Sequence, residues 1–256
     1  MSVADNFLAF RNAYMITQEV TGSISYRYKR LTRQLNSTFW NTDSESSHSR
    51  YIGSYGRDTA ARGVSDIDVY FQLPFSVYQQ YNGYLVNGQS ALLQAVRNSI
   101  GNTYPTTSLR GDGQVVVIPF TDSITIELLP GFANNDGSIT FPDANGGGCW
   151  RTCNPTAEMN AFAARNTEAN HNLKAIGRMA RVWKGQNGVN MSGMLIDTLA
   201  YNFIGTWAYK DKSYMYHDYL VRDFFLYLSQ IDPAQERWNA PGSGSWVRRT
   251  GGFGCL

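Results

Sequence analysis

The chain has 256 residues, 43% of them apolar, which suffices for one large domain or two smaller ones with a sizeable core. Only 16% are charged and the formal net charge is +2, which argues against a strongly basic surface for nucleic acid or membranes. We find no secretory signal and no run of about 18 apolar residues, so no membrane partner is expected. The three cysteines are an odd number, which argues against a disulfide framework and favours a cytoplasmic location.

Apolar side chains recur at helical spacing over residues 3–39, which predicts one long amphipathic helix, loosened at Gly22. The elements expected after it are, in chain order, a serine-rich loop at 41–49, a short strand at 51–52, a central strand at 66–73, a helix at 89–100 and a hairpin of strands at 114–120 and 123–129.

A segment rich in Gly, Asn and Asp at 133–148 predicts a loop between a β-rich half and a helical half. Asn154 and Pro155 are typical of a helix start, as the cap and the first position. The helices expected after them span 156–185, 193–208 and 214–229. The sequence thus predicts an α+β fold with a domain at 1–148, a helical lobe at 149–240 and a flexible tail at 241–256.

Two carboxylates stand two positions apart, as Asp66 and Asp68, at the start of the predicted central strand. Residues i and i+2 of a strand point to the same face, so both side chains aim at one point. Glu127 supplies a third carboxylate on the otherwise apolar strand at 123–129. If the two strands lie side by side, three negative charges meet, which is unfavourable unless cations compensate them.

Divalent cations would remove this repulsion. Two Mg²⁺ or Mn²⁺ ions about 3.5–4 Å apart can stabilise both the attacking and the leaving oxygen of a phosphoryl-type transfer. We therefore predict that Asp66, Asp68 and Glu127 are the catalytic and metal-binding residues, with two ions per active site.

A glycine and a serine, Gly53 and Ser54, precede the carboxylates by a short spacer. Glycine lets the backbone approach a ligand closely, and successive backbone amides with a hydroxyl can hold phosphate. This pair is predicted to contact the β- and γ-phosphates of a nucleoside triphosphate. Arg57 and Arg62 in the spacer could contact phosphate, but they could equally be ordinary surface charges.

The segment from Gly53 and Ser54 through Thr59 to Ser65-Asp66-Ile67-Asp68 resembles the DNA polymerase β-type nucleotidyltransferase superfamily. Within it, the chain is most similar to the bacterial cGAS-like cyclic-oligonucleotide synthases, the CD-NTase or SMODS group. Further similar segments, which extend the resemblance over about residues 1–230, are 126–132 with Glu127, 150–155 with its Trp-x-Thr-x-Asn-Pro pattern, the basic helix at 178–184 and Ser192 at the start of the next helix.

The resemblance implies a mixed-sheet polymerase β-like nucleotidyltransferase core with a long N-terminal helix, a C-terminal helical lobe and an active-site cleft between them. It implies nucleoside triphosphate substrates and a cyclic di- or trinucleotide product that activates an effector in anti-phage (CBASS-type) signalling. It also places Arg181, Lys184 and Ser192 near the triphosphate. The family usually has lysine at the position of Arg181, and arginine binds as a planar fork.

Two other functions fit the same motifs. The first is a nucleotidyltransferase that tails RNA or modifies a protein or small molecule, although the modest net charge argues against a stable nucleic-acid partner. The second is a non-catalytic nucleotide-binding relative, which the three intact carboxylates disfavour. In some relatives the C-terminus is conjugated to a partner, and Gly251-Gly252 and Cys255-Leu256 leave that open here.

Overall fold

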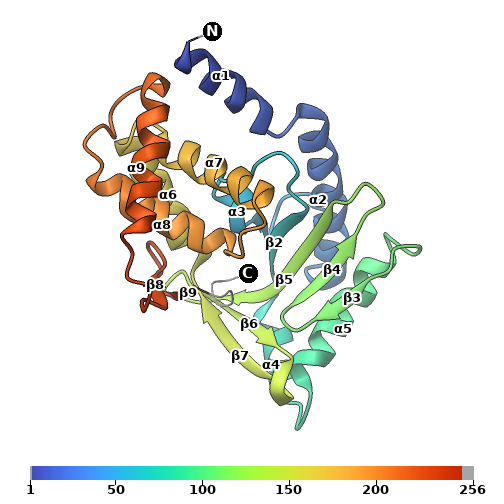
Figure 1. Ribbon diagram of the computed structural model, residues 1–256. Helices are drawn as coiled ribbons and strands as arrows, with labels where there is room; N and C mark the ends of the chain where they lie inside the picture. The colour runs from blue at the N-terminus through green and yellow to red at the C-terminus, as the bar shows by residue number, and fades with distance from the viewer. Residues whose placement is uncertain (1, 250–256) are drawn as a thin grey trace. The chain divides into compact units, whose positions relative to one another are not determined.

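The predicted central strand is β2 of a seven-stranded mixed sheet in the computed structural model, which describes residues 2–249. Figure 1 shows the elements along the chain, most of them labelled. They are α1 (Val3–Tyr14), α2 (Gln18–Phe39), β1 (Ser49–Tyr51), α3 (Gly53–Gly56), β2 (Asp66–Gln72), α4 (Phe75–Asn82), α5 (Gly88–Gly101), β3 (Arg110–Asp112), β4 (Val115–Pro119), β5 (Thr125–Ala133), β6 (Ile139–Asp143), η1 (Asn145–Gly147), β7 (Cys149–Cys153), α6 (Pro155–Glu168), α7 (Asn172–Gln186), α8 (Gly193–Thr206), η2 (Tyr214–Tyr216), α9 (His217–Ser229), β8 (Arg237–Asn239) and β9 (Trp246–Arg248).

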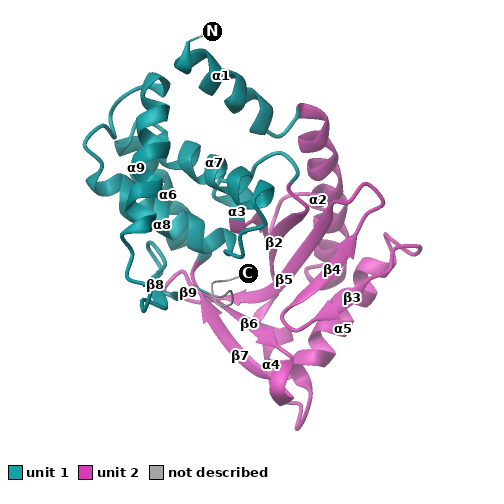
Figure 2. Ribbon diagram, in the orientation of Figure 1, with its two compact units in different colours: residues 1–17, 54–63, 155–256 teal, residues 18–53, 64–154 magenta. Residues whose placement is uncertain are grey.

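The described residues form two compact units, coloured separately in Figure 2. Unit 2 contains residues 18–53 and 64–154 and holds the large sheet, whose main strand order is β1-β2-β5-β4-β3. Strands β2 and β5 run parallel, whereas β6 extends the sheet from the end of β5 and pairs with β7. Helices α2 and α5 contact each other and the sheet strands. The α+β fold class and the mixed sheet are confirmed.

Strand β2 lies between β1 and β5, and the apolar residues that alternate along it bury one of its faces. Ile67, Val69 and Phe71 are fully buried and share one face, whereas Asp66 is exposed and Asp68 is partly exposed on the other. A strand that buries one complete face can pair in only one register, because a shift by one residue would expose the apolar set. This register fixes where the carboxylates of β2 lie relative to β5.

Unit 1 contains residues 2–17, 54–63 and 155–249 of the described chain. Helices α1, α6, α7, α8 and α9 enclose an apolar core that includes Phe162, Ile176, Leu199 and Phe224. The predicted helical lobe therefore includes two segments from earlier in the chain, α1 and residues 54–63. No helix of the described residues is long and apolar enough to cross a membrane.

The prediction of one helix over 3–39 is wrong, because the chain breaks between α1 and α2. Met15 leaves the helical conformation with ψ 138° and caps α1. The β-branched residues Ile16 and Thr17 follow, which are weaker helix formers. Gly22, the predicted weak point, lies inside α2.

The loop predicted at 133–148 is also wrong, because β6 occupies its middle. Ile139 and Phe141 alternate with polar neighbours and are buried, so tertiary packing overrides the loop-like composition. The predicted helix over 156–185 is divided between α6 and α7, where Asn170 and His171 adopt positive φ.

Part of the predicted flexible tail is ordered, because β9 pairs with β8 and buries Val247. The rest of that tail, residues 250–256, lies outside the described residues. Cys153 is disulfide-bonded, contrary to the expectation from the odd cysteine count, whereas Cys149 is an exposed, unpaired thiol. Approach of two thiols is a three-dimensional property that a count cannot reveal.

Candidate active site

The acidic residues on β2 and β5 occupy one face of adjacent strands. Asp68 is the register partner of Glu127, and Asp66 is the partner of Thr125. Paired residues of neighbouring strands have their side chains on the same face, and such strands lie about 4.8 Å apart. Asp66, Asp68 and Glu127 therefore face the same side of the sheet, as the spacing on each strand predicts.

The environment of Glu127 disfavours its negative charge. Partial burial raises the pKa of this carboxyl above its ordinary value, and the nearby Asp66 and Asp112 raise it further. Arg110 offsets only part of this effect. The residues around Glu127 in unit 2 disfavour its charged form on balance, whereas a cation bound nearby would stabilise that form.

The donors fit a hard divalent cation, although they do not form a preassembled cage. Carboxylate oxygens are the ligands that Mg²⁺ prefers, and here three of them come from two adjacent strands. Within residues 2–249, no three His, Cys, Asp or Glu side chains are close enough together to hold a metal ion. Like charges oppose a closer approach of the three carboxylates.

Gly53 packs directly against Asp68. Its φ of +59° lies in the left-handed region, and a Cβ built on it would lie 1.7 Å from Oδ2 of Asp68. The backbone is held nearby, because the Ile52 N–H donates to the Asp68 carbonyl over 2.9 Å. Glycine is required here both by the backbone conformation and by the position of the Asp68 carboxylate.

Gly53→Ala is expected to reduce product formation by at least about a hundredfold, because the new methyl group displaces the Asp68 carboxylate by an ångström or more. Steady-state rates with nucleoside triphosphates measure this. Gly63→Ala is the matched control, since Gly63 also has positive φ but no heavy atom lies within 4 Å of the place that its Cβ would take. Equal losses in the two variants would mean that backbone strain, and not the contact with Asp68, is responsible.

Glu127→Gln is expected to abolish product formation and yet to raise Tm at pH 7 by about 1–2 °C. The raised pKa means that the ionised carboxyl destabilises the fold, and this penalty appears as pH rises through the folded-state pKa. Thermal melts from pH 7 to pH 4 test this, since glutamine stays neutral and its advantage should vanish as Glu127 protonates. Glu45→Gln, at an exposed surface pair with Arg33, should bring no gain, and a lower Tm for Glu127→Gln at pH 7 would contradict the argument.

Ser54 begins the part of unit 1 that follows Gly53 directly in the chain. Its carbonyl accepts hydrogen bonds from the Thr59 N–H at 2.9 Å and from the Ala60 N–H at 3.2 Å. These bonds fold residues 54–60 back on themselves and fix the backbone at Ser54. The phosphate contacts of Gly53 and Ser54 stay a prediction.

Arg181, Lys184 and Ser192 all lie in unit 1, at α7 and the start of α8. The Arg181 guanidinium forms a two-pronged ion pair with Asp197 and also donates to the Gly193 carbonyl over 3.0 Å. Ser192 caps α8, because its hydroxyl accepts from the Leu195 N–H at 3.1 Å. Lys184 is partly exposed on α7. Arg181 and Ser192 thus have structural partners, and the nucleotide contacts of all three residues stay predictions.

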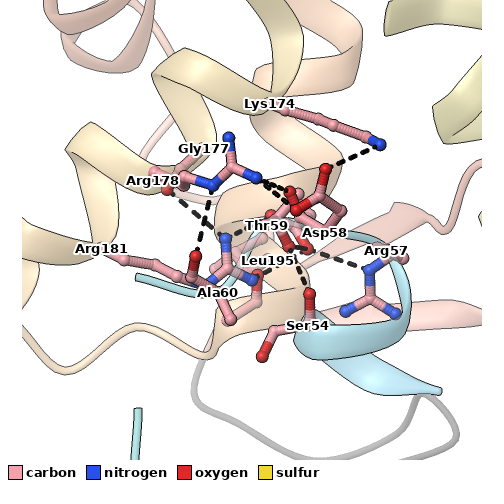
Figure 3. Close-up of polar contacts among 12 residues, drawn as sticks. Ser54, Arg57, Asp58, Thr59, Ala60, Lys174, Gly177, Arg178, Arg181 and Leu195 are labelled. Atoms are coloured by element: carbon pink, nitrogen blue, oxygen red, sulfur yellow. Dashed lines mark hydrogen bonds and ion pairs between the residues drawn. The ribbon is translucent and has the colours of Figure 1, made fainter. Parts of the chain in front are cut away.

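The structure adds a polar cluster that the sequence did not predict, formed by the buried residues Arg57, Thr59, Glu158 and Asp197 with the partly buried Arg181. Figure 3 shows the contacts that several of these residues make around the segment 57–60. One signal in the sequence could have revealed the centre of the cluster. Asp197 is a single charge in the apolar run of α8, and a buried charge requires partners.

Comparison with known proteins gives a family and a fold. A family model described as the Second Messenger Oligonucleotide or Dinucleotide Synthetase domain (SMODS) matches residues 1–166. A search of curated proteins found no significant match.

Several solved structures share the fold. The CD-NTase CdnG of Bradyrhizobium diazoefficiens, in complex with GTP, has a TM-score of 0.66 and 10% identity, covering 90% of this chain and 76% of CdnG. CdnC of E. coli MS115-1, in its HORMA-deltaN complex, has a TM-score of 0.64 and 16% identity, covering 88% of this chain and 70% of CdnC. The cyclic AMP-GMP synthase DncV of Vibrio cholerae has a TM-score of 0.61 and 12% identity, covering 85% of this chain and 75% of DncV.

Proposed function

We propose that this chain, which belongs to the Second Messenger Oligonucleotide or Dinucleotide Synthetase family and is a nucleotidyltransferase, joins nucleoside triphosphates. The proposed product is a cyclic di- or trinucleotide. The observation that carries this proposal is the register of β2 and β5, which gives Asp66, Asp68 and Glu127 a common face. The fold shared with CdnG, CdnC and DncV supports it.

Asp66, Asp68 and Glu127 are the residues that would hold the divalent cations in this reaction. Bound Mg²⁺ or Mn²⁺ would neutralise the phosphates and lower the pKa of the attacking hydroxyl. The hydroxyl oxygen forms a bond to the α-phosphorus, its proton is lost to solvent, and the bond to the leaving pyrophosphate breaks.

The backbone around Gly53 orients the triphosphate in this proposal. The absence of a side chain at Gly53 leaves room for the Asp68 carboxylate, and the Ser54 hydroxyl and amides are assigned to the β- and γ-phosphates. Since the same carboxylates serve every round, the linear intermediate must rebind with its free hydroxyl at the site before the ring closes. Because burial and neighbouring carboxylates raise the pKa of Glu127, a cation bound beside it would favour its charged form.

The biological setting is inferred from the family. We assign the product to an effector of the CBASS type in anti-phage defence, and we place the enzyme in the cytoplasm, where its substrates are made. A C-terminal conjugation partner stays a prediction, and residues 250–256 lie outside the described residues.

The decisive experiment incubates the purified protein with all four labelled nucleoside triphosphates and Mg²⁺ or Mn²⁺. The reaction is then treated with phosphatase and analysed by mass spectrometry. A phosphatase-resistant cyclic product is expected. Extension of added RNA instead would identify a tailing enzyme, and nucleotide binding without turnover would identify a non-catalytic relative. Either of these results would overturn the proposal.

A further inference from the structure

We propose that Asp197 and Thr59 are positioning residues that hold Ser54 in place for the triphosphate, and that Arg181 acts through Asp197 and not by touching phosphate. This inference rests on the proposed function, because it assumes that Ser54 receives the phosphates. It gives a role to the polar cluster around Asp197, which takes no part in the proposed reaction at Asp66, Asp68 and Glu127.

Asp197 is completely buried at the centre of this cluster. Its Oδ2 accepts from Thr59 Oγ1 at 2.9 Å, from Arg57 Nε at 3.0 Å and from Arg181 Nη2 at 2.8 Å, while its Oδ1 accepts from Arg181 Nη1. Burial alone would raise the pKa of Asp197, but the charges of Arg181 and Arg57 outweigh it and hold the pKa below its ordinary value. The charged form of this carboxylate is therefore favoured, and it accepts four hydrogen bonds, three at Oδ2 and one at Oδ1.

Thr59 links this anion to the phosphate-binding segment. The side-chain hydroxyl of Thr59 donates to Asp197, and its backbone N–H donates to the Ser54 carbonyl over 2.9 Å. Moving Thr59 would thus move Ser54. Ser54 follows Gly53 directly in the chain.

Each residue from Arg57 to Ala60 is anchored to α7 or α8, as Figure 3 shows for the labelled contacts. Arg57 and Thr59 bind Asp197 on α8. On α7, Arg178 binds the Asp58 carboxylate and the Ala60 carbonyl, and Lys174 lies 3.2 Å from the Asp58 carboxylate. Four consecutive residues bound to neighbouring helices hold this segment rigidly. A rigid segment that presents backbone amides binds a ligand more tightly, because less conformational entropy is lost on binding.

Arg57 and Arg181 are directed inward in this arrangement. Arg57 is 4% exposed and lies between Asp197 and the buried Glu158, whose Oε2 is 3.6 Å from Arg57 Nη1. Arg181 uses both terminal nitrogens to bind Asp197. Since each guanidinium already has a carboxylate partner, neither is available as the main phosphate contact unless the cluster is broken.

The test compares Thr59→Val, which keeps the shape and removes the hydroxyl, with Thr59→Ser, which keeps the hydroxyl. Affinities of the purified full chain for ATP, GTP, CTP and UTP with Mg²⁺, and for the four monophosphates, are measured by calorimetry, together with Tm. Thr59→Val should weaken triphosphate binding about tenfold and leave monophosphate binding unchanged, because Ser54 is assigned to the β- and γ-phosphates. Thr59→Ser should stay within about twofold of the unaltered protein.

Thr198→Val is the matched control. Thr198 is also fully buried and follows Asp197, but its hydroxyl has no hydrogen-bond partner among residues 2–249. This variant should bind triphosphates like the unaltered protein. If Thr59→Val behaves like Thr198→Val, or loses monophosphate and triphosphate affinity equally, the proposed positioning role is overturned.

Arg181→Lys supplies a second variant that keeps the charge but loses the two-pronged contact with Asp197. It should weaken triphosphate binding selectively, as Thr59→Val does. Unchanged or tighter binding would overturn the inference, and tighter binding would point to a direct contact of this cation with phosphate. If the unaltered protein forms the cyclic product while these variants bind triphosphate normally, only this inference fails. If it neither binds triphosphate nor forms product, the proposed function fails with it.

Discussion

Asp66→Ala combined with Asp68→Ala should abolish formation of the cyclic product, with a loss of at least about a thousandfold, while the protein stays folded. Both side chains lie on the polar face of β2, so their removal leaves the buried face of Ile67, Val69 and Phe71 intact. The variant loses two of the three carboxylates that are assigned to the cations. Its Tm should be equal to or higher than that of the unaltered protein, because a source of repulsion on Glu127 is removed.

The measurement is the mass-spectrometric assay for cyclic product, run beside thermal melts. Asp43→Ala with Glu45→Ala is the matched control, because it removes the same charge from two carboxylates that pair with Arg33 on the surface. This control should retain full activity. Product formation by the Asp66/Asp68 variant at the normal rate would show that the proposed site is not the catalytic one.

Asp197→Ala is expected to give the largest loss of stability, about 3–5 kcal/mol in the free energy of unfolding. The substitution leaves Arg57 and Arg181 without their shared anion, and Arg57 is almost completely buried. Because the pKa of Asp197 is lowered, its contribution is present above the ordinary pKa of an aspartate and is lost only as pH falls through the folded-state value. The Tm should fall by about 10 °C at pH 7, and most of that difference should persist at pH 5.

Thermal and urea unfolding of the two proteins measure this effect. Asp122→Ala serves as the comparison, because Asp122 also forms a two-pronged pair, with Arg27, but its side chain is 44% exposed. An exposed pair contributes about 0–1 kcal/mol, so this variant should lose little. A loss for Asp197→Ala that is no greater than that for Asp122→Ala would contradict the central role of Asp197 in unit 1.

Features that depend on neighbouring residues could be predicted from the sequence. The period-2 pattern of the strands at 66–73 and 123–129 shows which side chains share a face, so the common direction of Asp66 and Asp68 was predictable. The helices at α5, α8 and α9 also follow their apolar spacing closely. Predictions based on composition alone were wrong at β6 and β9, because burial of Ile139, Phe141 and Val247 outweighs a local preference for loop.

The class of chemistry could be predicted from the sequence, because carboxylate spacing, strand periodicity and the family motif are all local patterns. The partners of the charged groups could not, because they come from segments far apart in the chain. Thr59 and Asp197 are 138 residues apart in the chain and 2.9 Å apart in the fold, and no local pattern encodes that contact. The same reason applies to Arg181, which was predicted to bind phosphate but pairs with the buried carboxylate of Asp197. It applies also to Gly53, where the position of Asp68 leaves no room for a side chain.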